Sequence, residues 1–158
     1  MKDLIENLVS AFSTAFGSTF KSYNFGPVRI PGQSSMPMLT VSPVQTDITN
    51  SGTVKDNNLY TVRVVVEDNL KQYFDNVSGE GDTIDALAQL VTWVEDRNAD
   101  NSVKDATVIG VIRNNLTASG ATLYNDNITV DYEDYLVEAE FPKIKATITF
   151  VAEVRSTR

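Results

Sequence analysis

The feature that most constrains the fold is a strict alternation of apolar and mostly polar residues over 144–155. Apolar side chains stand there at every even-numbered position: Ile144, Ala146, Ile148, Phe150, Ala152 and Val154. A period of two is the signature of a β-strand that buries one face. These residues therefore predict a long strand packed against a core on one side.

A second strand is expected just upstream, so that 126–155 forms an antiparallel C-terminal β-hairpin. Its apolar positions change phase at Glu133-Asp134, which predicts a bulge or a bend there. We place the turn of this hairpin at Phe141-Pro142-Lys143. A second pair of strands is expected over 38–48 and 58–68, around a segment rich in turn-forming residues. Pro43 lies within the first of these strands and cannot donate a ladder hydrogen bond, which indicates an edge strand or a bulge.

Helical spacing marks two other regions. Apolar residues recur at intervals of three and four over 3–16, and Gly17 is a plausible end for that helix. A second amphipathic helix is expected over 83–97, with Asp82 as its N-cap. Residues 102–116 favour a further short helix, although Gly110 and several β-branched residues leave a strand open.

Residues 17–37 are predicted to form an extended arm, because glycines and prolines interrupt any regular pattern there. Loops of this length are often functional or wrap a partner. Phe20, Tyr23 and Phe25 are the candidate anchors of the arm. The sequence leaves open whether they are buried by a neighbouring subunit or by the chain itself. The order of expected elements predicts a single α+β domain over 1–158, a mainly antiparallel sheet with helices packed on one face.

Composition excludes several classes of function. The 158 residues include no cysteine and no histidine, so thiol nucleophiles, Cys/His zinc sites and Ser–His pairs are absent. Thirteen basic and 21 acidic residues give a net charge of −8, which disfavours nonspecific binding to nucleic acid. We expect no signal peptide, because Asp3, Glu6, Asn7 and Ser10 interrupt the apolar residues near the N-terminus. We expect no membrane partner, since no apolar run approaches about 20 residues.

Three motifs suggest chemistry, and each has a simpler structural explanation. The segment 96–102 resembles the start of an EF-hand loop, but Asn101 and Thr107 stand where that loop needs Gly and Glu. Gly79-Glu80-Gly81 precedes a helix as phosphate-binding turns do, yet its acidic neighbours would repel a phosphate. Six carboxylates within 126–140 could serve a glycosidase, although nothing selects a catalytic pair. We therefore expect no catalytic residue, no cofactor and no metal, and no enzymatic activity.

The charge distribution along the C-terminal hairpin is more informative. Residues 126–140 contain six acidic and no basic residues, whereas 141–158 contain four basic residues and one acidic residue. Opposite charges on two surfaces could join copies head to tail in a ring. The alternative is a set of cross-strand ion pairs within one chain. The candidate lumen or ring-interface residues are Asp131, Glu133, Asp134, Lys143 and Lys145.

The order of these segments carries a resemblance. An amphipathic helix from Leu4 to Phe16 leads through the arm to a strand ending in Leu59-Tyr60-Thr61-Val62-Arg63-Val64-Val65-Val66. The helix Thr83-Ile84-Asp85-Ala86-Leu87-Ala88-Gln89-Leu90-Val91 follows, and the hairpin closes with Ala146-Thr147-Ile148-Thr149-Phe150-Val151-Ala152-Glu153-Val154. In layout and length, over nearly the whole chain, this resembles the tail terminator proteins of long-tailed bacteriophages.

The resemblance implies a structural virion protein of the phage tail and neck, assembled in the host cytoplasm. Such proteins form a homo-oligomer, a hexameric ring at the head-proximal end of the tail tube. The ring ends tube polymerisation and joins the tail to the head. Its partners are then the tail tube protein and a head-side neck protein, and DNA passes through without specific binding. An acidic lumen would avoid holding the phosphates.

Other functions stay open at this stage. Another neck or head–tail connector protein would have a similar sequence pattern. A small α+β module that binds a ligand or peptide on its sheet is the alternative from a different class. A carboxylate-based hydrolase is the third.

Overall fold

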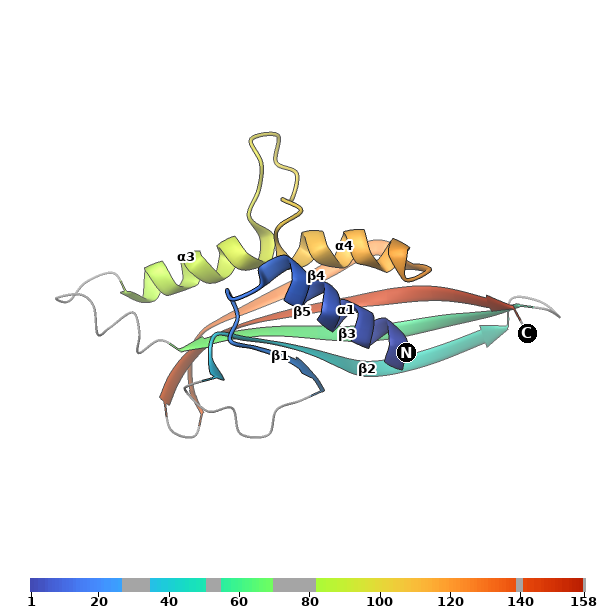
Figure 1. Cartoon of the computed structure of the whole chain (residues 1–158), viewed down its shortest axis with the longest axis horizontal. Helices are drawn as coiled ribbons and strands as arrows, with labels where there is room; N and C mark the ends of the chain where they lie inside the picture. Colours follow the sequence, from blue (N-terminus) through green and yellow to red (C-terminus); the bar gives the residue numbers. More distant parts are fainter. Residues whose placement is uncertain (27–34, 51–54, 70–81, 139–140, 158) are drawn as a thin grey trace.

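The computed structural model describes residues 1–26, 35–50, 55–69, 82–138 and 141–157 (Figure 1). The side chains of 50, 55, 82–85, 134–142 and 156–157 also lie outside the description. The described elements, in chain order, are α1 (Lys2–Phe16), β1 (Ser22–Phe25), β2 (Met38–Asn50), β3 (Lys55–Asn69), α3 (Asp82–Glu95), α4 (Val108–Ala118), β4 (Ala121–Glu138) and β5 (Phe141–Thr157).

The five strands form one sheet in the order β1-β2-β3-β5-β4. Two antiparallel hairpins, β2–β3 and β4–β5, are joined side by side by a long antiparallel pairing of β3 with β5. That pairing runs from Lys55 opposite Thr157 to Asn69 opposite Lys143. Among the described strands, only the short β1 pairs in parallel, with β2. The α+β class and the mainly antiparallel sheet are therefore confirmed.

The core joins the helices to one set of alternating sheet residues. Val62, Val64 and Val66 of β3 are completely buried, as are Ile144 and Ile148 of β5. They pack with the apolar stripes of the three helices in one continuous cluster. In Figure 1, α3 and α4 run along the sheet and α1 crosses it beside them. The helical contribution to the cluster consists of Leu4, Ile5, Leu8, Phe12, Ala86, Leu90, Val94, Val108, Ile109, Val111, Ile112 and Leu116.

The strands expected at 38–48 and 58–68 are confirmed, and so is the irregularity at Pro43. The register between β2 and β3 shifts between Pro43 and Gln45, which leaves Val44 without a partner residue and nearly half exposed. A bulge at this point accommodates a residue that has no N–H to donate. β1 pairs only with Met38–Val41, so the outer edge of β2 has no described partner strand beyond Val41.

The C-terminal hairpin is present, but its turn is not where the sequence predicts it. The register of β4 on β5 shifts between Glu133 and Leu136, as the phase change predicts. The turn predicted at Phe141–Lys143 is wrong: β5 already begins at Phe141, which pairs with Glu138. Pro142 fits in this strand because it lies beyond the last residue of β5 that pairs with β3.

The helix boundaries follow local signals. α1 ends at Gly17, whose φ of 51° suits a glycine, as predicted. α4 is a helix, but it begins at Val108 rather than near residue 102. Thr107 caps it, since its hydroxyl accepts a hydrogen bond from the Gly110 N–H at 3.1 Å. α3 spans Asp82–Glu95, and the side chain of the predicted N-cap Asp82 lies outside the description.

The predicted arm is not wholly irregular. Residues 22–25 form β1, which extends the sheet by pairing with Met38–Val41. Sequence patterning misses it because four residues are too few to show an alternation. Residues 27–34 of the arm and the loop segment 70–81, with Gly79-Glu80-Gly81, lie outside the described residues.

Candidate functional site

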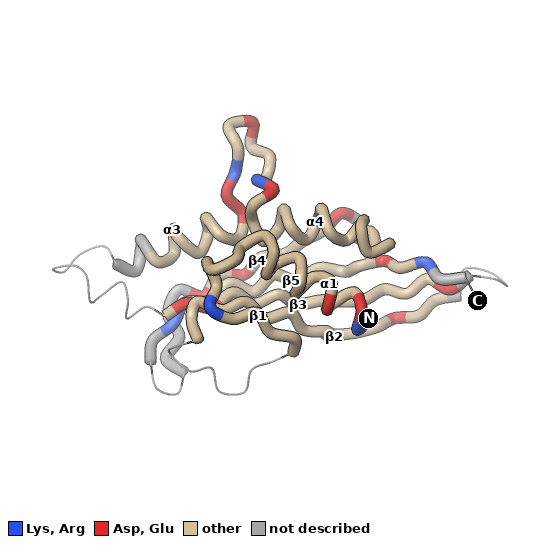
Figure 2. Tube along the Cα trace, in the orientation of Figure 1, with Lys and Arg blue, Asp and Glu red and all other residues tan. Residues whose placement is uncertain are grey.

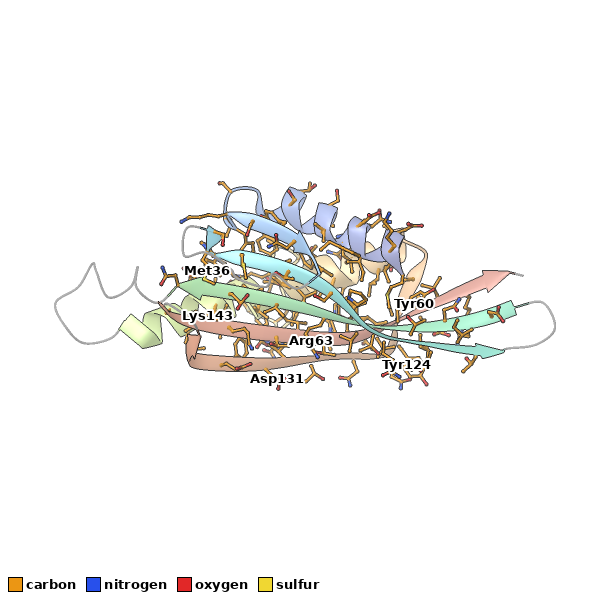
Figure 3. The ribbon with its side chains drawn as sticks, turned by 90° about the horizontal axis from the view of Figure 1, so that it is seen from below. Met36, Tyr60, Arg63, Tyr124, Asp131 and Lys143 are labelled. Carbon is orange, nitrogen blue, oxygen red and sulfur yellow. The ribbon has the colours of Figure 1, made fainter. Side chains whose placement is uncertain are left out.

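The candidate site is a shallow groove on the sheet face opposite to the apolar core. It is formed by residues of the other parity on four strands, and we call it the polar groove. It is lined by Thr40, Ser42, Arg63, Val65, Glu67, Asp131, Glu133, Lys145, Thr147 and Thr149. The strand register places these side chains in rows across the sheet, for example Thr40, Val65, Thr147 and Asp131. Figure 3 looks onto this face, with Arg63 near its middle and Asp131 on the β4 side.

Two lysines proposed from the sequence as ring-interface residues have partners within the chain. Lys145 Nζ lies 2.8 Å from Glu133 Oε1, directly across the β4–β5 pairing. Lys143 Nζ lies 2.6 Å from Glu67 Oε1 on β3, and both side chains are almost fully buried. The sequence leaves two readings of this charge pattern open. The geometry of these three candidates favours cross-strand ion pairs within one chain.

The remaining acidic candidates differ from one another. The Asp131 side chain is exposed on the groove wall, and no partner is found for it among the described residues. Asp134 falls in the register shift of β4, where only the strand is described. The predicted concentration of negative charge on this face is thus partly neutralised by Lys145.

Arg63 is a groove residue that charge counting along the chain does not select. It lies on β3 between Ser42 of β2 and Thr149 of β5. Its side chain is exposed, and the described part of the chain offers it no ion-pair or hydrogen-bond partner. The signal was available, because Arg63 is the single charge within the apolar run from Val62 to Val66 and so must face away from the core.

A buried hydroxyl at the floor of the groove is also unsatisfied. Thr40 is 5% exposed, and its Oγ1 has no hydrogen-bond partner. A buried polar group left unpaired costs about 1–3 kcal/mol. The groove therefore contains both an unpaired cation and an unsatisfied hydroxyl.

The three candidate arm anchors have different environments. Phe20 is 2% exposed, and its ring packs edge-on against Phe16 and Trp93 at 5.1 and 5.2 Å between centroids. Tyr23 packs on Phe20, and its hydroxyl donates to the Gly17 carbonyl at 2.8 Å. Burial raises the pKa of Tyr23. Phe25 is 52% exposed. Two anchors thus hold the arm on its own chain, and one remains on the surface.

The segment that resembles an EF-hand loop satisfies its carboxylates internally. It projects from the helical layer between α3 and α4 and carries charges of both signs (Figure 2). Asp96 pairs with Lys104 at 2.5 Å, and this hydrogen bond lowers the pKa of Asp96. Asp100 accepts hydrogen bonds from Ser102, which lower its pKa as well. Within the described ranges, no group of acidic side chains is placed to hold a metal ion.

A second hollow lies between this loop, α4 and β4. Glu95 and Arg97 line this hollow. The Tyr132 hydroxyl of β4 donates to Glu95 Oε1 at 2.7 Å, and Glu95 also pairs with Arg97. Burial first, and then the Glu95 carboxylate, raise the pKa of Tyr132. The loop is held tightly on α4, because a Cβ on Gly110 would overlap the Lys104 carbonyl. These contacts fasten the loop to the body of the protein. Arg113 of α4 also lines the hollow and has no ion-pair or hydrogen-bond partner among the described residues.

Neither protein-family models nor curated proteins provide a relative of this chain. Among the described helices, none is both long and apolar enough to cross a membrane. No protein-family model matches the chain. A search of curated proteins also finds no significant match. The polar groove and the order of the elements are therefore the features that bear on function.

Proposed function

We propose that this chain is a non-enzymatic phage tail terminator, or a closely related neck protein. In this proposal a single domain, with its helices packed on one sheet face, forms a hexameric ring at the head-proximal end of the tail tube. The ring ends tube growth and provides the surface to which the head-side neck protein binds. Six copies of an acidic chain surround DNA that passes through without specific binding.

The observation that carries this proposal is the polar groove. Antiparallel sheets often pack one face on a core and leave the other in water. Here the other face holds an unpaired arginine, an unsatisfied buried hydroxyl and two cross-strand ion pairs. The guanidinium and the hydroxyl can still form hydrogen bonds with a partner, so this surface suits contact with another protein. The order of helix, hairpin, helices and hairpin is the layout on which the sequence resemblance to that family rests.

The groove fits a subunit interface better than a lumen. A cation that lines a DNA channel attracts phosphates and slows passage. Arg63, in the middle of the groove, would do this if the face pointed to the ring axis. We therefore assign the groove, with Asp131, Glu133 and Lys145 on its wall, to contact between subunits.

A ligand- or peptide-binding module is the second candidate, and the same groove favours it. A shallow surface lined by hydroxyls suits an extended peptide. The two functions differ in stoichiometry. A terminator meets other copies of itself, whereas a binding module stays monomeric and takes up a foreign peptide.

Electron microscopy of the purified protein, alone and mixed with phage tail tubes, tests the proposal. We expect rings, alone or at tube ends, and tubes that no longer elongate when fresh tube subunits are added. Sedimentation at increasing concentration should show a multimer, either in isolation or on the tubes. A protein that stays monomeric under every condition and leaves tube growth unchanged would overturn the proposal.

A further inference from the structure

We propose that an exposed bulge of β4, residues Tyr124–Asn127, docks into the polar groove of the next copy, with the Asp126 carboxylate on Arg63. This inference rests on the proposed ring and specifies its contact surfaces. One surface of a subunit meets a different surface of its neighbour, which is the arrangement that closes into rings. Three features support this contact: the cation, the carboxylate and the shape of the bulge.

Most described cations have a partner. Among the described residues the exceptions are Lys21, Arg63 and Arg113, and of these three only Arg63 lines the polar groove. Lys104, Lys143 and Lys145 each pair with a carboxylate of the same chain. Arg63 has no such partner in the described structure, although acidic residues outnumber basic ones by 21 to 13. A guanidinium bonds a carboxylate through two parallel N–H donors, which makes it specific as well as strong. Ser42 and Thr149, on either side, supply hydroxyls that also donate to a carboxylate.

The carboxylate that would bind Arg63 of the next copy is identified by elimination among the described acidic residues. Most of them accept a hydrogen bond or an ion pair from their own chain, as Asp96, Asp100 and Glu153 do. Asp3 lies in the first turn of α1, where a negative charge is already stabilised by the helix dipole. Asp131 lines the groove itself. Asp126 is the exposed carboxylate that is left without an assigned interaction.

The shape of the bulge suits an insertion. The β4–β5 register is interrupted between Leu123 and Ile128, and the four residues between them are all exposed. Asn125 and Asp126 both have positive φ, 55° and 50°, a conformation that non-glycine residues adopt at a cost. Tyr124 is 40% exposed beside them and lies toward one end of the sheet, away from Lys143 (Figure 3). An aromatic ring next to a carboxylate, on a free sheet edge, is a typical interface anchor.

Cysteine cross-linking tests the contact cleanly because the chain has no cysteine of its own. Two single variants, Arg63→Cys and Asp126→Cys, are mixed under mild oxidation, with tail tubes present if assembly requires them. We expect disulfide-linked dimers in the mixture and far fewer in either variant alone. The double variant should give a ladder of cross-linked species that stops at six. The matched control mixes Arg113→Cys with Asp126→Cys, because Arg113 is exposed but lies on α4.

Charge exchange provides a second readout. Arg63→Glu and Asp126→Lys should each raise the concentration at which half of the protein assembles by about tenfold, which corresponds to about 1.4 kcal/mol. The double variant should recover most of that loss. Asp126→Asn removes the charge but tolerates positive φ, so it separates the ion pair from the backbone conformation. Thermal unfolding of each variant checks that the fold is kept.

The outcomes separate this inference from the proposed function. If the wild-type protein forms rings but the 63–126 mixture cross-links no better than the control, this contact is wrong and the terminator function stands. If the mixture cross-links while sedimentation shows only open, growing filaments, the contact is right and the ring is wrong. A wild-type protein that stays monomeric on tubes, with no cross-link, overturns both.

Discussion

The two faces of the β3–β5 pair have the same backbone but different chemistry. On one face Val64 and Ile148 lie opposite each other and are completely buried in the core cluster, which also contains residues of the helices. On the other, one residue along, Arg63 and Thr149 lie opposite each other on the polar groove. The alternation of side chains allows one face to hold the fold together while the other is free for contact. Substitutions on the two faces should therefore have very different effects.

The largest difference is expected between adjacent residues of β5. Phe150→Ala removes a core ring and should lower the free energy of unfolding by about 3–5 kcal/mol. Thr149→Ala, on the groove, should lower it by less than about 1 kcal/mol. Urea denaturation followed by circular dichroism measures both. Equal losses would show that the groove face is also covered in the isolated chain.

The next test concerns the two lysines of the groove face. Lys143→Ala leaves Glu67 buried without its cation and should cost about 3 kcal/mol. Lys145→Ala breaks a half-exposed pair and should cost about 0.2–1 kcal/mol. The double variant Lys143→Met with Glu67→Leu should recover most of the first loss, because no buried charge remains. If the two single variants behave alike, the burial of the Lys143 pair is not what distinguishes them.

Removing a single hydroxyl from each face should give effects of opposite sign. Tyr132→Phe, on the core side, loses the hydrogen bond to Glu95 and should cost about 0.5–1.5 kcal/mol. Thr40→Val, on the groove side, removes an unsatisfied buried hydroxyl and should raise stability by up to about 1 kcal/mol. Thermal unfolding compares the two variants with the wild type. A loss of stability in Thr40→Val would mean that this hydroxyl has a partner in solution.

The smallest effect is a change with pH. The pKa of Tyr132 is raised in the folded chain, whereas an unfolded tyrosine titrates near pH 10. The folded state therefore holds this proton more tightly. Its contribution to stability is complete below about pH 10 and is lost as the pH rises through the folded pKa. Wild-type protein should lose more stability than Tyr132→Phe between about pH 9 and pH 11, measured by the urea midpoint.

The sequence predicts those parts of the fold that depend on local periodicity. The alternation around Ile148 marks β5, and the spacing of Leu4, Leu8 and Phe12 marks α1. β1 cannot be found in this way, because its existence depends on a parallel pairing with Met38–Val41 that four residues do not encode.

The candidate site is predictable only in part, for a related reason. Parity places Lys143 and Lys145 on one face, but it does not say which residue the register brings opposite them. The partner of Lys143 is Glu67, which lies 76 residues away in the chain. Arg63 and Thr40 become significant only in the structure. There, no described residue forms an ion pair with Arg63 or a hydrogen bond with the Thr40 hydroxyl.

The position of β5 in the sheet has a consequence for synthesis of the protein on the ribosome. This strand is made after the other four, yet it lies between β3 and β4 and pairs with both. The sheet cannot close until residues 141–157 have left the exit tunnel. Until then the inner edge of β3 and the whole of β4 lack their partner, and non-local pairing of this kind is slow. A nascent chain stalled before residue 141 should therefore be a substrate for chaperones rather than a partly assembled subunit.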